Sequence, residues 1–170
     1  MDSQKIKNLI DQVESQGKEN DQLLLEITKD YTEQLDNMVV KIQRKLSESE
    51  GDLPIDDLIH YIAELCPIVY YVIAKLEALG IRSDMSEQLR VEKYNQARQS
   101  AAGTATDKTS FAELETTDES FVSNIYSRAY KSIKSRVDAA QMTIDALKKS
   151  LSAKMLEVQL MRSQNNVMSN

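Results

Sequence analysis

This sequence of 170 residues contains few of the residues that enzymes and secreted domains usually need. It has one cysteine, one histidine, two phenylalanines, four glycines, two prolines and no tryptophan. A single cysteine, Cys66, cannot form an internal disulfide, which favours a reducing compartment. The scarcity of glycine and proline, together with a charged fraction of 28%, favours long helices over sheets and loops. We therefore predict an all-α fold.

Catalytic chemistry has few candidate residues in this chain. His60 and Cys66 are six positions apart, which places them on opposite faces of a helix, whereas a catalytic Cys–His pair must lie within hydrogen-bond reach. The sequence has no metal-ligand spacing, no glycine-rich phosphate loop and no Gly-x-Ser-x-Gly motif. The adjacent acids Asp56 and Asp57 fit a helix start, where the helix dipole stabilises negative charge. We therefore expect a protein that is not an enzyme and that has neither a metal site nor a cofactor.

No segment is apolar enough to predict a membrane span. The most apolar run, residues 58–74, includes His60, Glu64 and Pro67 and is shorter than the roughly 20 residues that cross a bilayer. No apolar segment follows the polar start Met1–Gln4, so we expect no secretory signal. These features predict a soluble cytoplasmic protein without a membrane partner.

The strongest pattern in the sequence is a helical stripe between Thr116 and Met161. Thr116 and Glu119 have the spacing of a capping box, which marks a helix start. Apolar residues then recur about every 3.6 positions, as they do along one face of a straight helix. These residues are Val122, Ile125, Ala129, Ile133, Val137, Ala140, Ile144, Leu147, Leu151, Met155 and Val158. We predict a helix over 116–161, roughly 70 Å long, and a frayed tail over 163–170.

The N-terminal segment, residues 1–50, also has a helical pattern. Its apolar residues recur about every 3.7 positions from Leu24 to Leu46, and the polar cluster 47–51 ends the stripe. Gly17 is predicted to break the weaker pattern that precedes it. We interpret residues 1–50 as a packing or oligomerisation helix.

The rest of the chain, residues 52–162, is predicted to form a helical core. Pro67 is expected to kink or split its first helix, and Gly80 is expected to end that helix. A separate basic helix is predicted over 83–100. The small polar residues that follow predict a mobile loop over 99–115.

These apolar stripes are longer than a chain of 170 residues can cover with its own helices. We therefore expect long amphipathic helices in an elongated bundle or hairpin that assembles into a homo-oligomer. The predicted contacts with other copies lie on the N-terminal and C-terminal stripes: Leu24, Ile27, Tyr31, Met38, Ile133, Val137, Ile144 and Leu151.

The charges are distributed unevenly along the chain. The net charge is −6, but residues 1–60 carry 14 acids and 7 bases, whereas residues 120–170 carry 3 acids and 8 bases. This asymmetry permits an anionic partner at the basic end, or contacts between oppositely charged parts of neighbouring copies.

Two basic clusters are candidates for nucleic-acid binding. The first comprises Arg90, Lys93 and Arg98, with Tyr94 between them and Lys108 in the predicted loop. Such bases can neutralise phosphates while a flexible loop follows the strand. The second cluster lies opposite the apolar stripe of the C-terminal helix and comprises Arg128, Lys131, Lys134 and Lys149. The alternative for both clusters is a solvated helix surface, on which Glu87 and Glu92 pair locally with the bases of the first cluster.

The segment Leu89–Asn95 resembles the Arg-aliphatic-acid-x-Tyr element of the UvsY-type phage recombination mediators. Arg90 and Tyr94 match the arginine and tyrosine of that element, and Gln88 stands where the family has a lysine. The order of elements over residues 55–160 is also similar to that family. The resemblance implies a basic helix and loop facing single-stranded DNA, ring-like homo-oligomers, and the loading of a RecA-like recombinase onto strands covered by single-strand-binding protein.

The sequence thus leaves two functions open. The first is a non-enzymatic recombination mediator, in a bacterial cytoplasm if the protein is viral, with single-stranded DNA, a recombinase and single-strand-binding protein as partners. The alternative is a helical structural or adaptor protein, such as a virion or assembly component, that binds only other proteins.

Overall fold

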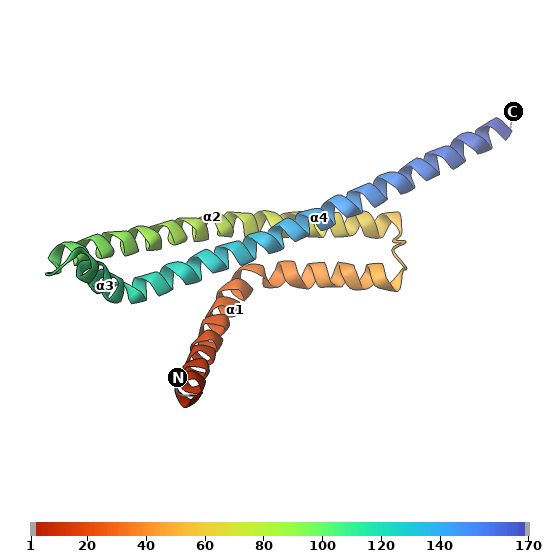
Figure 1. Cartoon of the computed structure of the whole chain (residues 1–170). Helices are drawn as coiled ribbons and strands as arrows, with labels where there is room; N and C mark the ends of the chain where they lie inside the picture. Colours follow the sequence, from red (N-terminus) through yellow and green to blue (C-terminus); the bar gives the residue numbers. More distant parts are fainter. Residues whose placement is uncertain (1–2, 169–170) are drawn as a thin grey trace. The chain divides into compact units, whose positions relative to one another are not determined.

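The computed structural model describes the backbone of residues 3–168 and the side chains of residues 14, 15 and 17–164. Within that part the chain forms four helices and no strand (Figure 1). The helices are α1 (Ser3–Glu48), α2 (Ile55–Ser100), α3 (Ala105–Glu115) and α4 (Thr117–Met168). The predicted all-α fold is confirmed.

The helices are divided between two compact units. Unit 1 comprises Met1–Tyr31 and Lys75–Ile133, and unit 2 comprises Thr32–Ala74 and Lys134–Asn170. Each boundary between the units falls inside one of the long helices, α1, α2 or α4.

Unit 2 contains a three-helix bundle made by residues 32–48 of α1, 55–74 of α2 and the first part of its α4 segment (Figure 1). The period of the apolar residues places one side of each helix toward the other two. The buried apolar side chains are Leu35, Met38, Ile42, Leu53, Leu58, Tyr61, Leu65, Val69, Val72, Val137, Ala140, Ile144 and Leu147. Removal of this surface from water is the main term that stabilises the bundle.

Polar contacts connect the helices of unit 2 at the edges of this core. Arg136 on α4 donates hydrogen bonds to Asp36 and, at 3.2 Å, to the Thr32 hydroxyl on α1. Lys154 of α4 pairs with Asp52 in the loop that joins α1 and α2. Residues 155–164 are all exposed, and Figure 1 shows this end of α4 extending past that loop.

Unit 1 includes residues 75–100 of α2, the short helix α3 and residues 117–133 of α4. The buried side chains of these segments are partly apolar and partly polar. With Thr116, which lies between α3 and α4, they are Leu76, Leu79, Ser86, Ala112, Ser123, Ile125, Ala129 and Ile133.

Neither glycine that was expected to interrupt a helix does so. The helix α1 continues through Gly17, and α2 continues through Gly80 as far as Ser100. The basic segment 83–100 is therefore part of α2 and not a separate helix. A glycine inside a helix costs only about 1 kcal/mol relative to alanine, and packing outweighs that cost at Gly80. A Cβ atom added to Gly80 would lie 3.2 Å from Cε2 of Tyr130 on α4.

Pro67 does not split α2, which is continuous from Ile55 onward. Proline lacks the N–H group that would bond to the carbonyl of Ala63, four residues earlier. Ala63 and Pro67 are both exposed, so this carbonyl lies on the face of the helix that water reaches.

The predicted loop over 99–115 is wrong, because residues 105–115 form α3. Thr104 and Asp107 form a capping box at its start: the Asp107 N–H donates to the Thr104 hydroxyl oxygen at 3.3 Å, and the Thr104 N–H donates to the Asp107 carboxylate at 2.9 Å. These bonds satisfy N–H groups that a helix start leaves unpaired. Ala112 is fully buried and attaches α3 to the core.

The long C-terminal helix is confirmed, but its ends differ from the prediction. It begins at Thr117, and the Thr116 hydroxyl donates to the carbonyl of Ala112 at 2.8 Å, so Thr116 ends α3 and does not form a capping box with Glu119. The helix continues to Met168 and includes most of the tail that was predicted to fray. Residues 1–2 and 169–170 of the predicted segments lie outside the described residues.

Candidate functional site

Two of the bases predicted to contact DNA, Arg90 and Lys93, form ion pairs with acids of the same chain. Arg90 donates through Nε and Nη2 to both carboxylate oxygens of Glu87, at 2.8 Å and 2.5 Å. The Arg90 side chain is 32% exposed. A guanidinium held by a carboxylate in this bidentate geometry has fewer donors left for a phosphate.

Two further polar contacts connect this part of α2 to α4 in unit 1. Lys93 pairs with Glu119, and the Ser123 hydroxyl donates to Glu87 at 2.9 Å. The hydrogen bonds from Arg90, with a smaller contribution from Ser123, lower the pKa of Glu87 to about 2. The hydrogen bond to Lys93 likewise lowers the pKa of Glu119, and the pKa of Lys93 is raised in return. We interpret Lys93 as a residue that holds α2 to α4, and Arg90 as the partner of Glu87, which accepts the hydrogen bond from Ser123 of α4.

The other predicted DNA contacts are Tyr94, Arg98 and Lys108. Tyr94 and Lys108 are half-buried, whereas Arg98 is exposed. In the part of the chain that the structure describes, Arg98 and Lys108 form no ion pair, so their charges remain available to a partner.

A hollow of about 370 Å³ lies between the last turns of α2 and α3. It is lined by Lys93, Gln96, Ala97, Ser100, Phe111 and Glu115. Its one base, Lys93, is already paired with Glu119, and Glu115 adds a negative charge. The hollow therefore lacks the charge of an anion site.

The residues predicted to contact another copy are divided between the core and the half-buried surface. Leu24, Ile27, Tyr31 and Leu151 are half-buried. The chain's own helices already cover the other four, which are 0–7% exposed: Met38, Ile133, Val137 and Ile144. The assignment of these four to an oligomer interface is corrected accordingly, since they belong to the internal cores.

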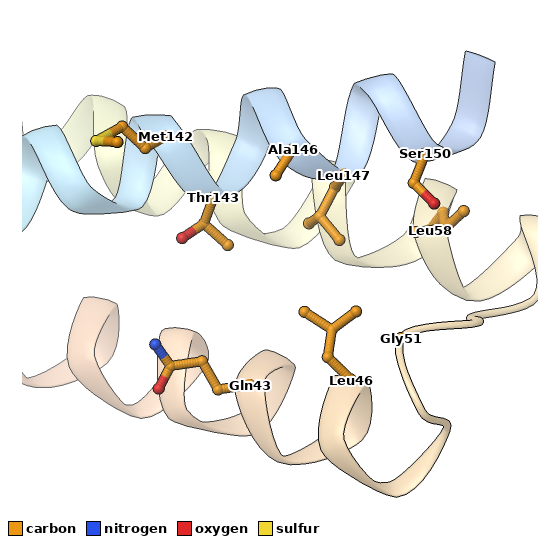
Figure 2. A pocket seen from close by; sticks show the side chains of 9 residues that line it. All are labelled: Gln43, Leu46, Gly51, Leu58, Met142, Thr143, Ala146, Leu147 and Ser150. Atoms are coloured by element: carbon orange, nitrogen blue, oxygen red, sulfur yellow. The ribbon is translucent and has the colours of Figure 1, made fainter. Parts of the chain in front are cut away.

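An open apolar groove in unit 2 was not anticipated from the sequence. It has a volume of about 370 Å³ and lies between α1 and α4, with α2 behind it (Figure 2). It is lined by Gln43, Leu46, Gly51, Leu58, Met142, Thr143, Ala146, Leu147 and Ser150. Met142 and Ala146 could have indicated the groove, because they are apolar but lie beside the stripe of α4 that forms the core.

The side chains of the groove show what it can accept. Figure 2 shows Leu46 of α1 extending toward Ala146 and Leu147 of α4. Leu58 and Leu147 are buried at its base, whereas Met142 at its edge is 73% exposed. None of the nine lining residues carries a charge. Such a groove suits the apolar face of a helix, and methionine adapts to ligands of different shape.

The described residues contain no cluster of side chains that could hold a metal ion. His60 lies 3.3 Å from Glu64 on an exposed helix face, and the thiol of Cys66 is exposed. Over the described part of the chain, no helix is both long enough and apolar enough to cross a membrane.

Comparison of the chain with known protein families, with curated proteins and with solved structures finds no match.

Proposed function

We propose that this chain is a non-enzymatic helical adaptor that binds an apolar helix of another protein in the groove of unit 2. The observation that carries this proposal is the uncharged groove between α1 and α4, with buried leucines at its base and exposed Met142 at its edge. A three-helix bundle with such a groove gains buried apolar area when a fourth helix fills it.

The experiment is affinity purification with the full chain and with two matched variants. Ala146→Glu places a carboxylate in the groove at an exposed position, so the bundle should still fold. Ala63→Glu places the same group on the opposite, exposed side of α2 and serves as the control. We expect a stoichiometric protein partner that survives nuclease treatment and is lost only with Ala146→Glu. Equal recovery by both variants would reject the groove as the binding site.

Assembly of several copies is part of the proposal. The last turns of α4 carry exposed apolar side chains beyond the bundle: Met155, Leu156, Val158, Leu160 and Met161. Exposed apolar surface on this scale favours association. Light scattering should give the full chain a mass larger than that of one copy. A chain that ends at Lys154 should have the mass of one copy. A single-copy mass for both would reject assembly through this segment.

A single-stranded DNA-binding recombination mediator is the second candidate, favoured by the resemblance of residues 89–95 and by bases that form no ion pair. Arg98 and Lys108, which form no ion pair within the described part of the chain, take the place of Arg90 and Lys93 as the proposed phosphate contacts. Exposed Arg128 and Lys131, three residues apart on α4, add to them. A mediator also binds a recombinase and single-strand-binding protein, so this function is compatible with an adaptor.

Fluorescence anisotropy with oligo-dT over a range of salt concentrations tests this candidate. Each phosphate contact contributes about −0.7 to the slope of log affinity against log salt. The double variant Arg98→Glu/Lys108→Glu should therefore reduce the magnitude of the slope by about 1.4. Lys75→Glu, at an exposed position elsewhere on α2, is the control. Absence of binding at low salt would remove DNA from the function.

A further inference from the structure

A second apolar surface lies on α2 in unit 1. Ile81, Met85 and Leu89 are 62%, 57% and 56% exposed. Their spacing of four residues places them along one side of the helix, about 40° apart in succession. An apolar ridge of two turns is thus open to water, and exposed ridges of this kind mark interaction sites.

The ridge is exposed because polar residues occupy the side of the same helix that faces α4. Ser86 is buried, Glu87 and Arg90 pair with each other, and Lys93 pairs with Glu119 of α4. In this segment, hydrogen bonds and ion pairs connect α2 to α4, and the apolar side chains of α2 face outward. This inverts the usual distribution in a helix of a water-soluble domain.

A hollow continues the ridge toward α4. It has a volume of about 150 Å³ and is lined by Ser86, Leu89, Asp118, Glu119 and Val122. Leu89 and Val122 are both exposed, so the hollow has apolar walls from two helices. A large apolar side chain of a partner, inserted here, would contact both α2 and α4.

Acidic residues border the ridge on one side of α2 and at the hollow, whereas Arg82 lies on the other side of the ridge, about 20° from Leu89. Glu77 and Asp84 lie about 40° and 60° from Ile81 on the side away from Leu89. Glu92 continues the line of the ridge, and Asp118 borders the hollow. Glu77, Asp84, Glu92 and Asp118 are exposed, and within the described residues none of them forms an ion pair. Arg82 is the one base between positions 77 and 89 of this helix.

We propose that this acid-bordered ridge binds a basic amphipathic helix of a partner protein. The partner's apolar face covers Ile81, Met85 and Leu89, and its lysines or arginines lie against the four carboxylates. Opposite charges around an apolar contact select the partner and raise the rate of association. This surface is distinct from the groove of unit 2, and its binding does not depend on what the groove holds. Two such surfaces would let one chain connect two proteins.

Two designed peptides test the proposal with the full chain. Each has about 20 residues, enough to sustain a helix, and a leucine stripe at helical spacing. One peptide carries lysines beside the stripe, and the other carries glutamates at the same positions. Fluorescence anisotropy should show that the lysine peptide binds more tightly by at least about tenfold, and that the difference decreases as salt rises. Equal affinities, or no binding of the lysine peptide, would overturn the proposal.

Variants at exposed positions locate the binding site. Met85→Glu should lower the affinity of the chain for the lysine peptide by about tenfold or more. Val40→Glu, at a 61% exposed position in unit 2, should leave this affinity unchanged. The double variant Asp84→Lys/Glu92→Lys should reverse the preference toward the glutamate peptide. Circular dichroism checks that each variant folds. If light scattering shows that Met85→Glu dissociates an oligomer, the ridge belongs to a second copy of the chain and the proposal is wrong.

Discussion

The ring of Tyr130 on α4 occupies the space beside Gly80 on α2. A Cβ atom at position 80 would lie 3.2 Å from Cε2 and 3.7 Å from Cδ2 of that ring. The absence of a side chain at Gly80 thus lets the two helices of unit 1 approach each other closely.

This contact predicts the effect of a larger residue at position 80. Gly80→Leu should lower the free energy of unfolding by about 1–3 kcal/mol, because the added side chain must displace the ring or separate the helices. Gly17→Ala is the control, since a Cβ atom there meets nothing within 4 Å. It should raise the free energy of unfolding by about 0.5–1 kcal/mol through helix propensity alone. Urea denaturation measures both changes, and destabilisation by Gly17→Ala would contradict a continuous α1.

The acid side of the pH–stability profile should depend on Glu87. Its folded pKa of about 2 lies below the ordinary value of 4.5, so the fold stabilises the carboxylate form. That contribution is complete above about pH 4.5 and is lost as the pH falls toward 2. Thermal melts at pH 7 should show that Glu87→Gln is less stable than the unmodified chain, and the difference should vanish near pH 2. Glu92→Gln is the control, since Glu92 is exposed and forms no ion pair within the described residues; it should leave the stability at pH 7 unchanged.

Ile144 tests whether the long stripe of α4 is covered by its own chain. Ile144 is 6% exposed and Met142, two residues away, is 73% exposed. Ile144→Ala should cost about 2–5 kcal/mol of unfolding free energy, while Met142→Ala should change it by less than about 0.5 kcal/mol. The loss should not depend on protein concentration, because the contacts lie within one chain. A concentration-dependent loss would instead place Ile144 at an interface between copies.

The capping box of α3 should control the local stability of that helix. Thr104→Ala removes the hydroxyl that accepts a hydrogen bond from the Asp107 N–H. It should lower the stability of α3 by about 1 kcal/mol. Hydrogen exchange of the amides in α3 should accelerate roughly fivefold. Thr109→Ala is the control, since its hydroxyl donates to the Ala105 carbonyl inside the helix and does not cap it. Equal acceleration in both variants would show that the cap does not stabilise α3.

The sequence predicts the long helices well because their apolar period is unbroken. The stripe from Val122 to Leu147 identified α4 and most of its inward-facing side. The sequence could not place the end of α2. A glycine marks a helix end only where no packing contact compensates for its cost in stability, and the contact of Gly80 is with Tyr130, which is far from it in the sequence. The helix α3 was missed because the small polar residues around Thr104 and Asp107 favoured a loop.

The basic cluster was predicted as a set of phosphate contacts, and local pairing with Glu87 and Glu92 belonged to the alternative interpretation. Glu87 lies three residues before Arg90, so that pair was foreseeable from helical spacing. Glu119 lies 26 residues after Lys93, and only the packing of α2 against α4 brings the two together. The groove of unit 2 was hidden for the same reason, since its walls come from three separated segments.

The exposed thiol of Cys66 has a practical consequence for all of these measurements. Because it is the only cysteine, a maleimide dye attaches at one defined point on α2, and two labelled populations can report assembly by energy transfer. The same thiol can also join two copies by an intermolecular disulfide when reductant is omitted, which would mimic a dimer on a sizing column. A Cys66→Ser chain separates such cross-links from genuine association.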